Sequence, residues 1–257
     1  MDKQHLKKIS NELLKTFIDA GERSIKLREI GLKKEIKSDN TPVTNGDIEV
    51  NNILTKKIKN ITPDIPIVSE ESSSNKSNTE MNNFWLIDPI DGTYDYVNNK
   101  DEFTLNAALI INKKPELGII YAPAKKRLFY TYGFGLSFEL ADNKEIKLTC
   151  EKKTGQNEVK AVSYSENLKP VISELHKKFK VTDHTKMKSS LKFCVVATSE
   201  FDLYVAEPRA SEWDIAAGHA ILKNAGGIIT DFNGNEIFYG KKDFKNPSLI
   251  IKRGENL

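Results

Sequence analysis

The chain has 257 residues, the size of one large domain or of two closely joined lobes. Its 39 basic and 36 acidic residues nearly cancel, so the net charge of +3 is not the footprint of a nucleic-acid-binding protein. No apolar run is long enough to cross a bilayer, and the charged N-terminus is unlike a secretory signal.

The two cysteines, Cys150 and Cys194, do not indicate a disulfide framework, which favours a reducing compartment. Cys194 lies in an apolar run, which is typical of a core residue rather than a nucleophile. We therefore expect a cytoplasmic location, with peripheral attachment at the inner membrane as the alternative.

The first part of the chain mixes helical and strand patterns. Apolar residues recur at helical spacing in 6–18 and again in 47–58, and a separate short helix is expected at 24–31. Turn residues fill 39–44. A short strand is predicted at 65–68, and the Ser/Asn-rich segment 72–83 is predicted to be a loop able to fold over a site.

The most informative stretch is 84–93, Phe-Trp-Leu-Ile-Asp-Pro-Ile-Asp-Gly-Thr. Its apolar start predicts a strand buried on both faces, and the proline is expected to end that strand at Asp88. Gly92 permits a tight turn, and Thr93 offers a hydroxyl and an N–H at a predicted helix start, where free amides favour anions. Two carboxylates beside such a turn indicate a divalent metal next to phosphate, although the same acids could be ordinary turn and N-cap residues.

The remaining elements are predicted from shorter patterns. Helical turns are expected at 94–97, and hairpin-connected antiparallel strands at 103–111, 117–121, 128–132 and within 133–150. Further along the chain we predict strands at 159–163, 202–205 and 228–230 and helices at 169–180, 187–197 and 211–222. Ser211 is the expected cap of the last helix, with Asp214 in its first turn.

Strands and helices mix without a strict βαβ rhythm. This pattern predicts an α/β (α+β) fold of stacked layers rather than a doubly wound sheet. We predict a single domain over 1–257, with sub-lobes of about 1–140 and 150–257.

Three sequence segments with acidic residues follow one another along the chain. They are Glu70-Glu71 after a strand, Asp88-Pro89-Ile90-Asp91-Gly92-Thr93, and Trp213-Asp214-Ile215-Ala216-Ala217-Gly218. Together they resemble the inositol monophosphatase superfamily of metal-dependent, lithium-sensitive phosphatases, whose D-P-x-D-G-T and W-D-x-A-A-G patterns are intact here. The stretches 101–110, 118–123 and 189–194 look like 3′(2′),5′-bisphosphate nucleotidases of the bacterial CysQ type. The resemblance runs from about Asp39 to the C-terminus.

The resemblance implies a layered α-β-α-β-α sandwich of the inositol monophosphatase and sugar phosphatase type. It also implies Mg²⁺-dependent hydrolysis of adenosine 3′,5′-bisphosphate to AMP and phosphate, with two or three ions per site and sensitivity to lithium. By similarity, Glu70, Asp88 and the backbone carbonyl of Ile90 would hold one ion. Asp88, Asp91 and Asp214 would hold the second, so that Asp88 bridges the pair.

The resemblance also implies catalytic roles. The Thr93 hydroxyl paired with Asp47 would activate the attacking water, with Glu70 as the third catalytic residue and Glu71 in support. The plain alternative for Asp47 and for Asp214 is a negative charge at a helix start.

Substrate contacts are expected at two ends of the pocket. Asp91, Gly92, Thr93 and Asp214 would meet the reacting end. Ser189, Ser190 and Lys192 match the turn that meets the non-scissile phosphate in the nucleotidases. This chain departs from that subfamily at Lys188, where glycine is usual, and at Ala206, where an arginine is usual; Arg209 could replace that arginine. The histidines are not expected to be ligands of a hard cation.

The leading hypothesis is therefore a Mg²⁺-dependent phosphatase of 3′-phosphorylated adenine nucleotides, a small-molecule enzyme that supports sulfur assimilation and RNA turnover. The missing arginine favours, as an alternative, an inositol or fructose 1,6-bisphosphate phosphatase. A non-catalytic nucleotide- or metal-binding protein is the alternative of another class. The chain has no interleaved aromatic and basic motif, so no nucleic-acid duplex is expected as a partner. Both a monomer and a homodimer are compatible with the sequence.

Overall fold

The computed structural model describes residues 1–37, 42–72, 76, 80–142, 144–151, 158–255 and 257. Residues 39–41 of the predicted turn and 73–75 and 77–79 of the predicted loop lie outside the described residues. Among those that are described, no helix combines the length and the apolar character needed to cross a membrane.

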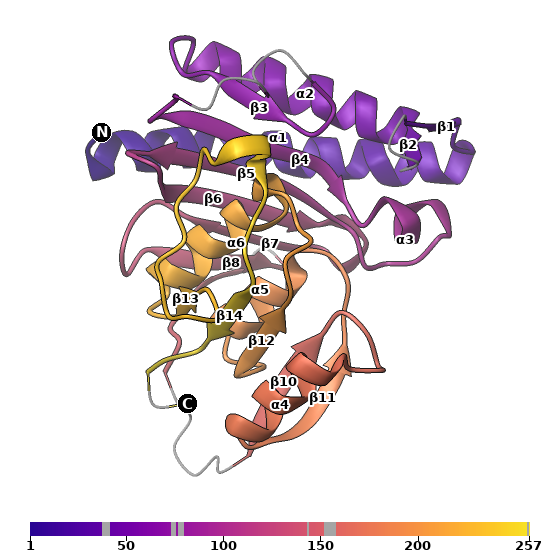
Figure 1. Ribbon diagram of the computed structural model, residues 1–257. Coiled ribbons are helices and arrows are strands. Elements are labelled where there is room, and N and C mark those ends of the chain that lie inside the picture. Colours follow the sequence, from indigo (N-terminus) through magenta and orange to yellow (C-terminus); the bar gives the residue numbers. More distant parts are fainter. Residues whose placement is uncertain (38–41, 73–75, 77–79, 143, 152–157, 256) are drawn as a thin grey trace.

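Two sheets organise the described part of the chain (Figure 1). The first has the strand order β3-β4-β5-β6-β7-β8-β9; β3 is parallel to β4 and the other neighbours are antiparallel, as predicted. Its strands are β3 (Ile67–Ser69), β4 (Phe84–Asp91), β5 (Thr104–Ile111), β6 (Lys114–Ala122), β7 (Arg127–Thr131), β8 (Ser137–Ala141) and β9 (Lys144–Lys147).

The second sheet has the mixed order β11-β10-β12-β14-β13. Its strands are β10 (Val159–Ser163), β11 (Val181–Lys186), β12 (Leu203–Ala206), β13 (Ile228–Thr230) and β14 (Leu249–Lys252). A separate two-stranded ribbon pairs β1 (Lys34–Ile36) with β2 (Pro42–Thr44).

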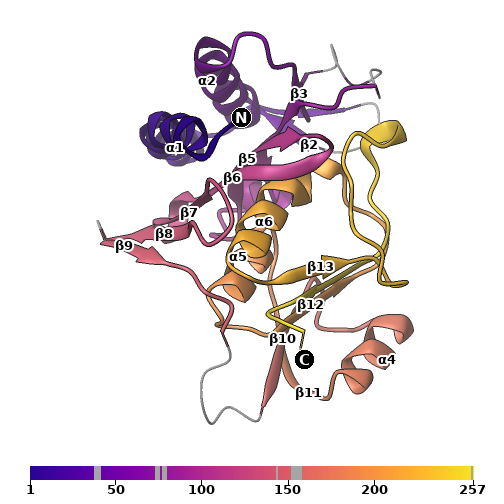
Figure 2. The same ribbon diagram turned by 90° about the vertical axis from the view of Figure 1, so that its left-hand side faces the viewer.

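The helices separate and cover the two sheets, and Figure 2 shows the layers edge-on. Helices α1 (Lys3–Ile30) and α2 (Asn45–Ile61) cover the outer face of the first sheet. Helices α5 (Leu191–Ala197) and α6 (Glu212–Asn224) lie between the sheets, and α4 (Pro170–Lys178) covers the outer face of the second. The short helix α3 (Thr93–Val97) follows β4. This arrangement confirms the predicted α-β-α-β-α layering.

Strand β4 is buried on both faces, as its continuous apolar run predicts. Phe84 and Leu86 face the core between the sheets, whereas Trp85 and Ile87 face α1 and α2. Because side chains alternate along a strand, the next residue on the inner face is Asp88. The sequence thus turns the first acid toward α6.

The prediction that the strand ends at Asp88 is wrong, because β4 continues to Asp91 with an irregularity in between. Asp88 pairs with Asn106 and Asp91 pairs with Thr104, so three steps on β4 oppose two steps on β5. This is the geometry of a β-bulge, a position that tolerates the missing N–H of Pro89. The extra residue matters for the site. Asp88 and Asp91 are three residues apart and would face opposite sides of a regular strand, but the bulge lets both side chains reach the face between the two sheets.

Helix α6 approaches its neighbours closely because its inward residues are small. A Cβ on Gly118 of β6 would lie 2.5 Å from the Ala217 carbonyl oxygen, and one on Gly218 would lie 2.4 Å from the Phe193 ring. The Ala-Ala-Gly part of the third motif therefore lets α6, which carries Asp214, pass between β6 and α5.

Three further points correct or confirm the sequence-based picture. The two helices expected at 6–18 and 24–31 are one continuous helix, α1, because the polar residues between them lie on one helical face. Strands β1, β2, β11 and β14 were not predicted, and β2 (Pro42–Thr44) occupies part of the predicted turn at 39–44, because those residues pair with β1. Leu249-Ile250-Ile251 is a short apolar run that signals a strand. Both cysteines are free, and Cys194 is fully buried, as predicted.

Candidate metal and phosphate site

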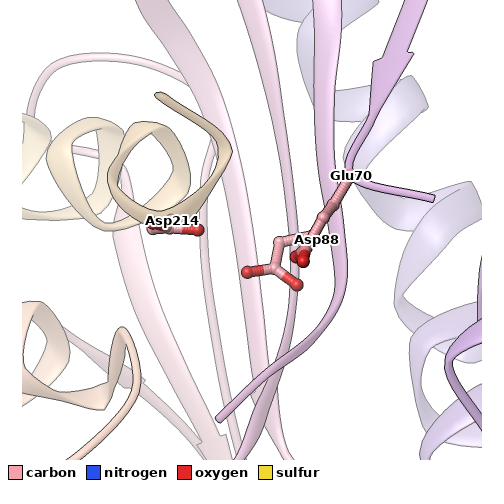
Figure 3. Close-up of side chains that lie close together, drawn as sticks. All are labelled: Glu70, Asp88 and Asp214. Carbon is pink, nitrogen blue, oxygen red and sulfur yellow. The ribbon is translucent and has the colours of Figure 1, made fainter. Parts of the chain in front are cut away.

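Three carboxylates from separate elements converge between the sheets (Figure 3). Glu70 follows β3, Asp88 lies on β4 and Asp214 lies in the first turn of α6. One carboxylate oxygen from each lies within 4.8 Å of the others. Asp91 adjoins this group and lines a small cavity together with Asp214. We call Glu70, Asp88, Asp91 and Asp214 the acidic side of the site.

Asp47 and Asp214 occupy the same position, the third residue of their helices. In each, one oxygen closes a capping box: Asp47 Oδ2 accepts from the Thr44 N–H at 2.8 Å, and Asp214 Oδ2 accepts from the Ser211 N–H at 2.7 Å. The other oxygen remains for the site. Each of these two carboxylates can therefore cap its helix with one oxygen and serve the site with the other. A structural role at the helix start and a functional role do not exclude each other.

Burial and mutual repulsion raise the pKa values of Asp88, Asp91 and Asp214. Burial raises the pKa of Asp214 to about 8, with further contributions from Asp91 and Glu70. Burial also raises the pKa of Asp91 to about 6, opposed by the Lys192 ammonium, and raises the pKa of Asp88 well above its usual range. When these acids are ionised, they repel one another, and a bound positive charge would stabilise them.

The donor set fits a hard divalent cation. It consists of carboxylate oxygens, which Mg²⁺ prefers, and within the described residues the buried Asp88 Oδ1 has no hydrogen-bond partner. An orphaned buried acceptor carries a cost that a bound cation would remove. The predicted ligand Ile90 is close by, since its carbonyl oxygen accepts from Thr93 Oγ1 at 3.1 Å.

The turn after β4 places the predicted catalytic pair together. Gly92 adopts φ 94°, the left-handed region that favours glycine, and α3 begins directly after it. Thr93 Oγ1 lies 3.3 Å from Asp47 Oδ1. Asp47 is buried, which raises its pKa, while the Thr44 hydroxyl and N–H act in the opposite direction. The structure thus joins residues 46 positions apart in the sequence.

Two lysines that the sequence did not single out border the acids. Lys37 Nζ lies 3.2 Å from Glu70 Oε1 and 2.6 Å from Glu71 Oε1. Lys76 Nζ donates to the Glu70 carbonyl oxygen at 2.5 Å and stands 5.0 Å from the ring centre of Trp213. No periodicity or motif distinguishes these lysines from the solvated ones, so only their position in space reveals them.

A basic side adjoins the acids. A cavity of about 120 Å³ is lined by Asp91 and Asp214 and by Ser189, Ser190, Lys192, Tyr204, Ala206 and Arg209, among others. Lys188 Nζ lies 3.2 Å and Arg209 Cζ 3.8 Å from the ring centre of Tyr164. Both cations therefore lie within cation–π distance of the same ring. We call Lys188, Lys192 and Arg209 the basic side.

One departure noted in the sequence, Lys188, belongs to the basic side. The other, Ala206, lines the same cavity as Arg209, the arginine expected as a replacement. Lys192 is buried, which lowers its pKa to about 8, although the nearby Asp91 carboxylate opposes the change. Tyr164 was not predicted from the sequence, because an isolated tyrosine after a strand gives no functional signal.

A larger depression of about 840 Å³ lies elsewhere, along α1 and the connection from β6 to β7. Its lining mixes both signs of charge and includes none of the acidic side. It therefore does not compete with the site between the sheets.

Comparison with known proteins agrees with this geometry. The family model described as the inositol monophosphatase family matches residues 2–256. Among similar proteins is the 3′(2′),5′-bisphosphate nucleotidase CysQ of Salmonella typhimurium, 34% identical over 84% of this chain and 87% of that protein. The protein of the same name from Buchnera aphidicola is 38% identical over 79% of this chain and 76% of its own length.

Solved structures extend the likeness to the fold. CysQ from Bacteroides thetaiotaomicron, described as a bacterial member of the inositol monophosphatase family, has a TM-score of 0.78 and 28% identity over 96% of this chain and 98% of its own. An IMPase/NADP phosphatase complexed with Mg²⁺ and phosphate has a TM-score of 0.79 at 20% identity, which shows the fold alone; it spans 96% of this chain and 91% of its own.

Proposed function

Because the chain belongs to the inositol monophosphatase family, we propose that it is a Mg²⁺-dependent phosphomonoester hydrolase that removes the 3′-phosphate of adenosine 3′,5′-bisphosphate. The observation that carries the proposal is the convergence of Glu70, Asp88 and Asp214 beside the Gly92–Thr93 turn. Similarity to the CysQ nucleotidases supports the choice of substrate.

In this proposal Glu70, Asp88, Asp91 and Asp214, with the Ile90 carbonyl, would hold two Mg²⁺ ions, and Asp88 would contribute to both. A third ion near Glu70 belongs to the same proposal, as does inhibition by lithium. Bound divalent ions would neutralise phosphate charge and lower the pKa of a coordinated water. The protein supplies the fixed positions of the carboxylates, which the bulge in β4 and the first turn of α6 determine.

Thr93 and Asp47 handle the proton of the attacking water. The single proton of the Thr93 hydroxyl is directed to Asp47 Oδ1 or to the Ile90 carbonyl oxygen. Its lone pairs therefore face away from these acceptors and can accept a hydrogen bond from water. The N–H groups at the start of α3 orient the reacting phosphate. Glu70 remains a predicted catalytic residue through its place beside this pair.

The basic side binds the second phosphate of the substrate. Lys192 and Arg209 line the cavity next to Asp91 and Asp214, and Lys188 lies at the Tyr164 ring beside Arg209. Cations grouped next to a metal site favour a substrate that carries an anionic group away from the scissile bond. Ser189 belongs to the same end of the pocket.

Three further predictions remain part of the proposal. The location is cytoplasmic, and the assembly is a monomer or homodimer.

Sub-lobes of about 1–140 and 150–257 form one domain, an organisation supported by the core cluster that joins residues of both sheets. The connection from β13 to β14 also returns to the first sheet, where the Tyr239 N–H donates to the Lys113 carbonyl oxygen at 3.0 Å (Figure 1).

A substrate panel with a Mg²⁺ titration tests the proposal. Phosphate release would be compared for adenosine 3′,5′-bisphosphate, inositol 1-phosphate and fructose 1,6-bisphosphate. We expect the highest kcat/KM for the nucleotide and no turnover in a chelator. Ala206 in place of the usual arginine favours a second candidate, an inositol or sugar phosphatase, and preference for either of those substrates would establish it instead.

A further inference from the structure

The turn 188–190 is attached to the end of the first sheet at three points. The Lys188 N–H donates to Glu102 Oε2 at 3.0 Å, and the Ser190 N–H acts to lower the pKa of the Asp91 carboxyl. The Ser190 hydroxyl contacts two side chains of β5. Ser190 is also the N-cap of α5, yet its side chain makes no capping hydrogen bond there. The hydroxyl is therefore directed away from its own helix and toward the strand that pairs with β4.

With the Asn106 amide oxygen facing Ser190, as it does in the structure, the direction of each hydrogen bond follows. Asn106 Oδ1 can only accept, so Ser190 Oγ donates to it over 2.7 Å. A serine hydroxyl carries one proton, so Thr104 Oγ1 must be the donor in its 2.8 Å contact with Ser190 Oγ. The result is a directed chain from Thr104 through Ser190 to Asn106. The amide N–H group of Asn106 is the unused end of this chain.

That unused end belongs to the residue opposite Asp88. Asn106 pairs with Asp88 across the β4–β5 ladder, so the two side chains lie on the same face of the sheet. Both residues are 1% exposed, and in the described part of the chain neither Asn106 Nδ2 nor Asp88 Oδ1 has a hydrogen-bond partner. An amide turned the other way would present its oxygen, a second acceptor, on the face that carries Asp88. In the structure the Ser190 hydroxyl takes the amide oxygen, and this leaves the amide donor on the face that carries Asp88.

We propose that Ser190 is a positioning residue for the acidic side rather than a contact of the substrate. Its hydroxyl orients the Asn106 amide on the face of Asp88. One turn of the second lobe thereby sets the polar group opposite an acid of the proposed metal site. The Ser190 hydroxyl has no proton left for a phosphate, so Ser189 and Lys192 carry that task. The inference rests on the proposed function only in that the acidic side binds a divalent cation.

Mn²⁺ titration of the metal-free protein without substrate tests this role, with free Mn²⁺ measured by electron paramagnetic resonance. Mn²⁺ takes the same hard oxygen ligands as Mg²⁺. Ser190→Ala leaves a buried acceptor and a buried donor without partners, so we expect its Mn²⁺ dissociation constant to rise about tenfold, with KM for the nucleotide within twofold of wild type. Ser189→Ala is the matched control: its hydroxyl accepts from the Leu191 N–H at 3.4 Å and is not part of the chain from Thr104 to Asn106, so its Mn²⁺ affinity should stay within twofold of wild type.

Unchanged Mn²⁺ affinity of Ser190→Ala combined with a raised KM would overturn the inference and make Ser190 a substrate contact. If Ser190→Ala does not fold, Thr104→Val and Thr104→Ser decide the matter. Val should weaken Mn²⁺ binding about threefold while Ser restores it, because only Ser keeps the donor; equal affinities for the two would refute the chain. Since no substrate is added, a failure of the nucleotide assay in wild type would refute the proposed function and leave this result standing.

Discussion

The acidic side and the basic side of the site are held in place by different kinds of structure. Asp88 and Asp91 are fixed by a bulged ladder, and Asp214 by a capping box at a helix start. Arg209 and Lys188 are instead held by one aromatic ring, on segments outside the regular strands and helices. Backbone geometry therefore determines the acids, whereas long side chains that can change rotamer determine the cations.

This difference suggests a division of roles. Asp88, Asp91 and Asp214 are placed on a strand and a helix, where main-chain hydrogen bonds restrict them. Lys188 and Arg209 are placed outside regular elements, where exchange of a residue changes the pocket without disturbing those acids. Changes on the acidic side should therefore affect turnover, and changes on the basic side should affect selectivity.

The largest expected effect comes from Asp88→Asn. Loss of the carboxylate shared by both ions should lower kcat for adenosine 3′,5′-bisphosphate about a thousandfold or more, because charge stabilisation at both oxygens of the displacement is lost. Asp64→Asn, on the exposed segment before β3, is the control and should keep full activity. Steady-state kinetics at saturating Mg²⁺ measures both, and near-normal turnover of Asp88→Asn would contradict the metal assignment.

The next effect concerns the catalytic pair. Thr93→Val should lower kcat about a hundredfold with little change in KM, because general-base assistance to water is lost while the amides that bind phosphate remain. Asp47→Asn should have a similar effect. Thr55→Val removes a hydroxyl that donates to the Asn51 carbonyl oxygen on α2 and should be nearly neutral for turnover. A Thr93→Val enzyme that keeps more than a tenth of wild-type kcat would separate this pair from catalysis.

The acidic side should also make the metal-free protein sensitive to pH. Asp91 and Asp214 have pKa values raised to about 6 and about 8, so between about pH 4 and pH 8 the folded state binds more protons than the unfolded state. The free energy of unfolding should therefore fall as pH rises through this window, on the order of 1.4 kcal/mol for each unit of pKa shift. Saturating Mg²⁺ supplies the missing positive charge and should flatten the dependence.

Thermal unfolding from pH 5 to pH 9, in chelator and in Mg²⁺, measures this sensitivity. Asp88→Asn in chelator should melt at a higher temperature than wild type at pH 8, because a neutral amide removes one buried repulsive charge. A melting temperature that rises with pH in chelator would show that the acids are not mutually repulsive.

The sequence predicted the features of the fold that follow from hydrophobic patterning along the chain. The two-sided burial of β4 follows from an uninterrupted apolar run, and the layered fold follows from the irregular mixture of strands and helices. The proposed metal ligands came from three motifs in order, and one carboxylate oxygen from each of three of these four acids lies within 4.8 Å of the others. The bulge was missed because proline signals a strand end as readily as a bulge. Lys37 and Tyr164 were missed because their importance lies in contacts between distant segments.

The smallest effect, and the one that bears most directly on the comparison, is expected on the basic side. Arg209→Gln should lower kcat/KM for adenosine 3′,5′-bisphosphate about tenfold while leaving adenosine 3′-monophosphate nearly unchanged, because a charge-assisted contact to the second phosphate is lost and the metal site is not touched. Arg23→Gln, which breaks only an exposed pair with Glu49, is the control and should leave the ratio of the two substrates unaltered. Lys188→Gly removes the other cation from the Tyr164 ring and restores the glycine usual in the subfamily, so it should change selectivity less than Arg209→Gln does. An equal loss for both substrates in Arg209→Gln would mean that the arginine acts through the acidic side, and the division between a fixed metal site and an adaptable selectivity pocket would fail.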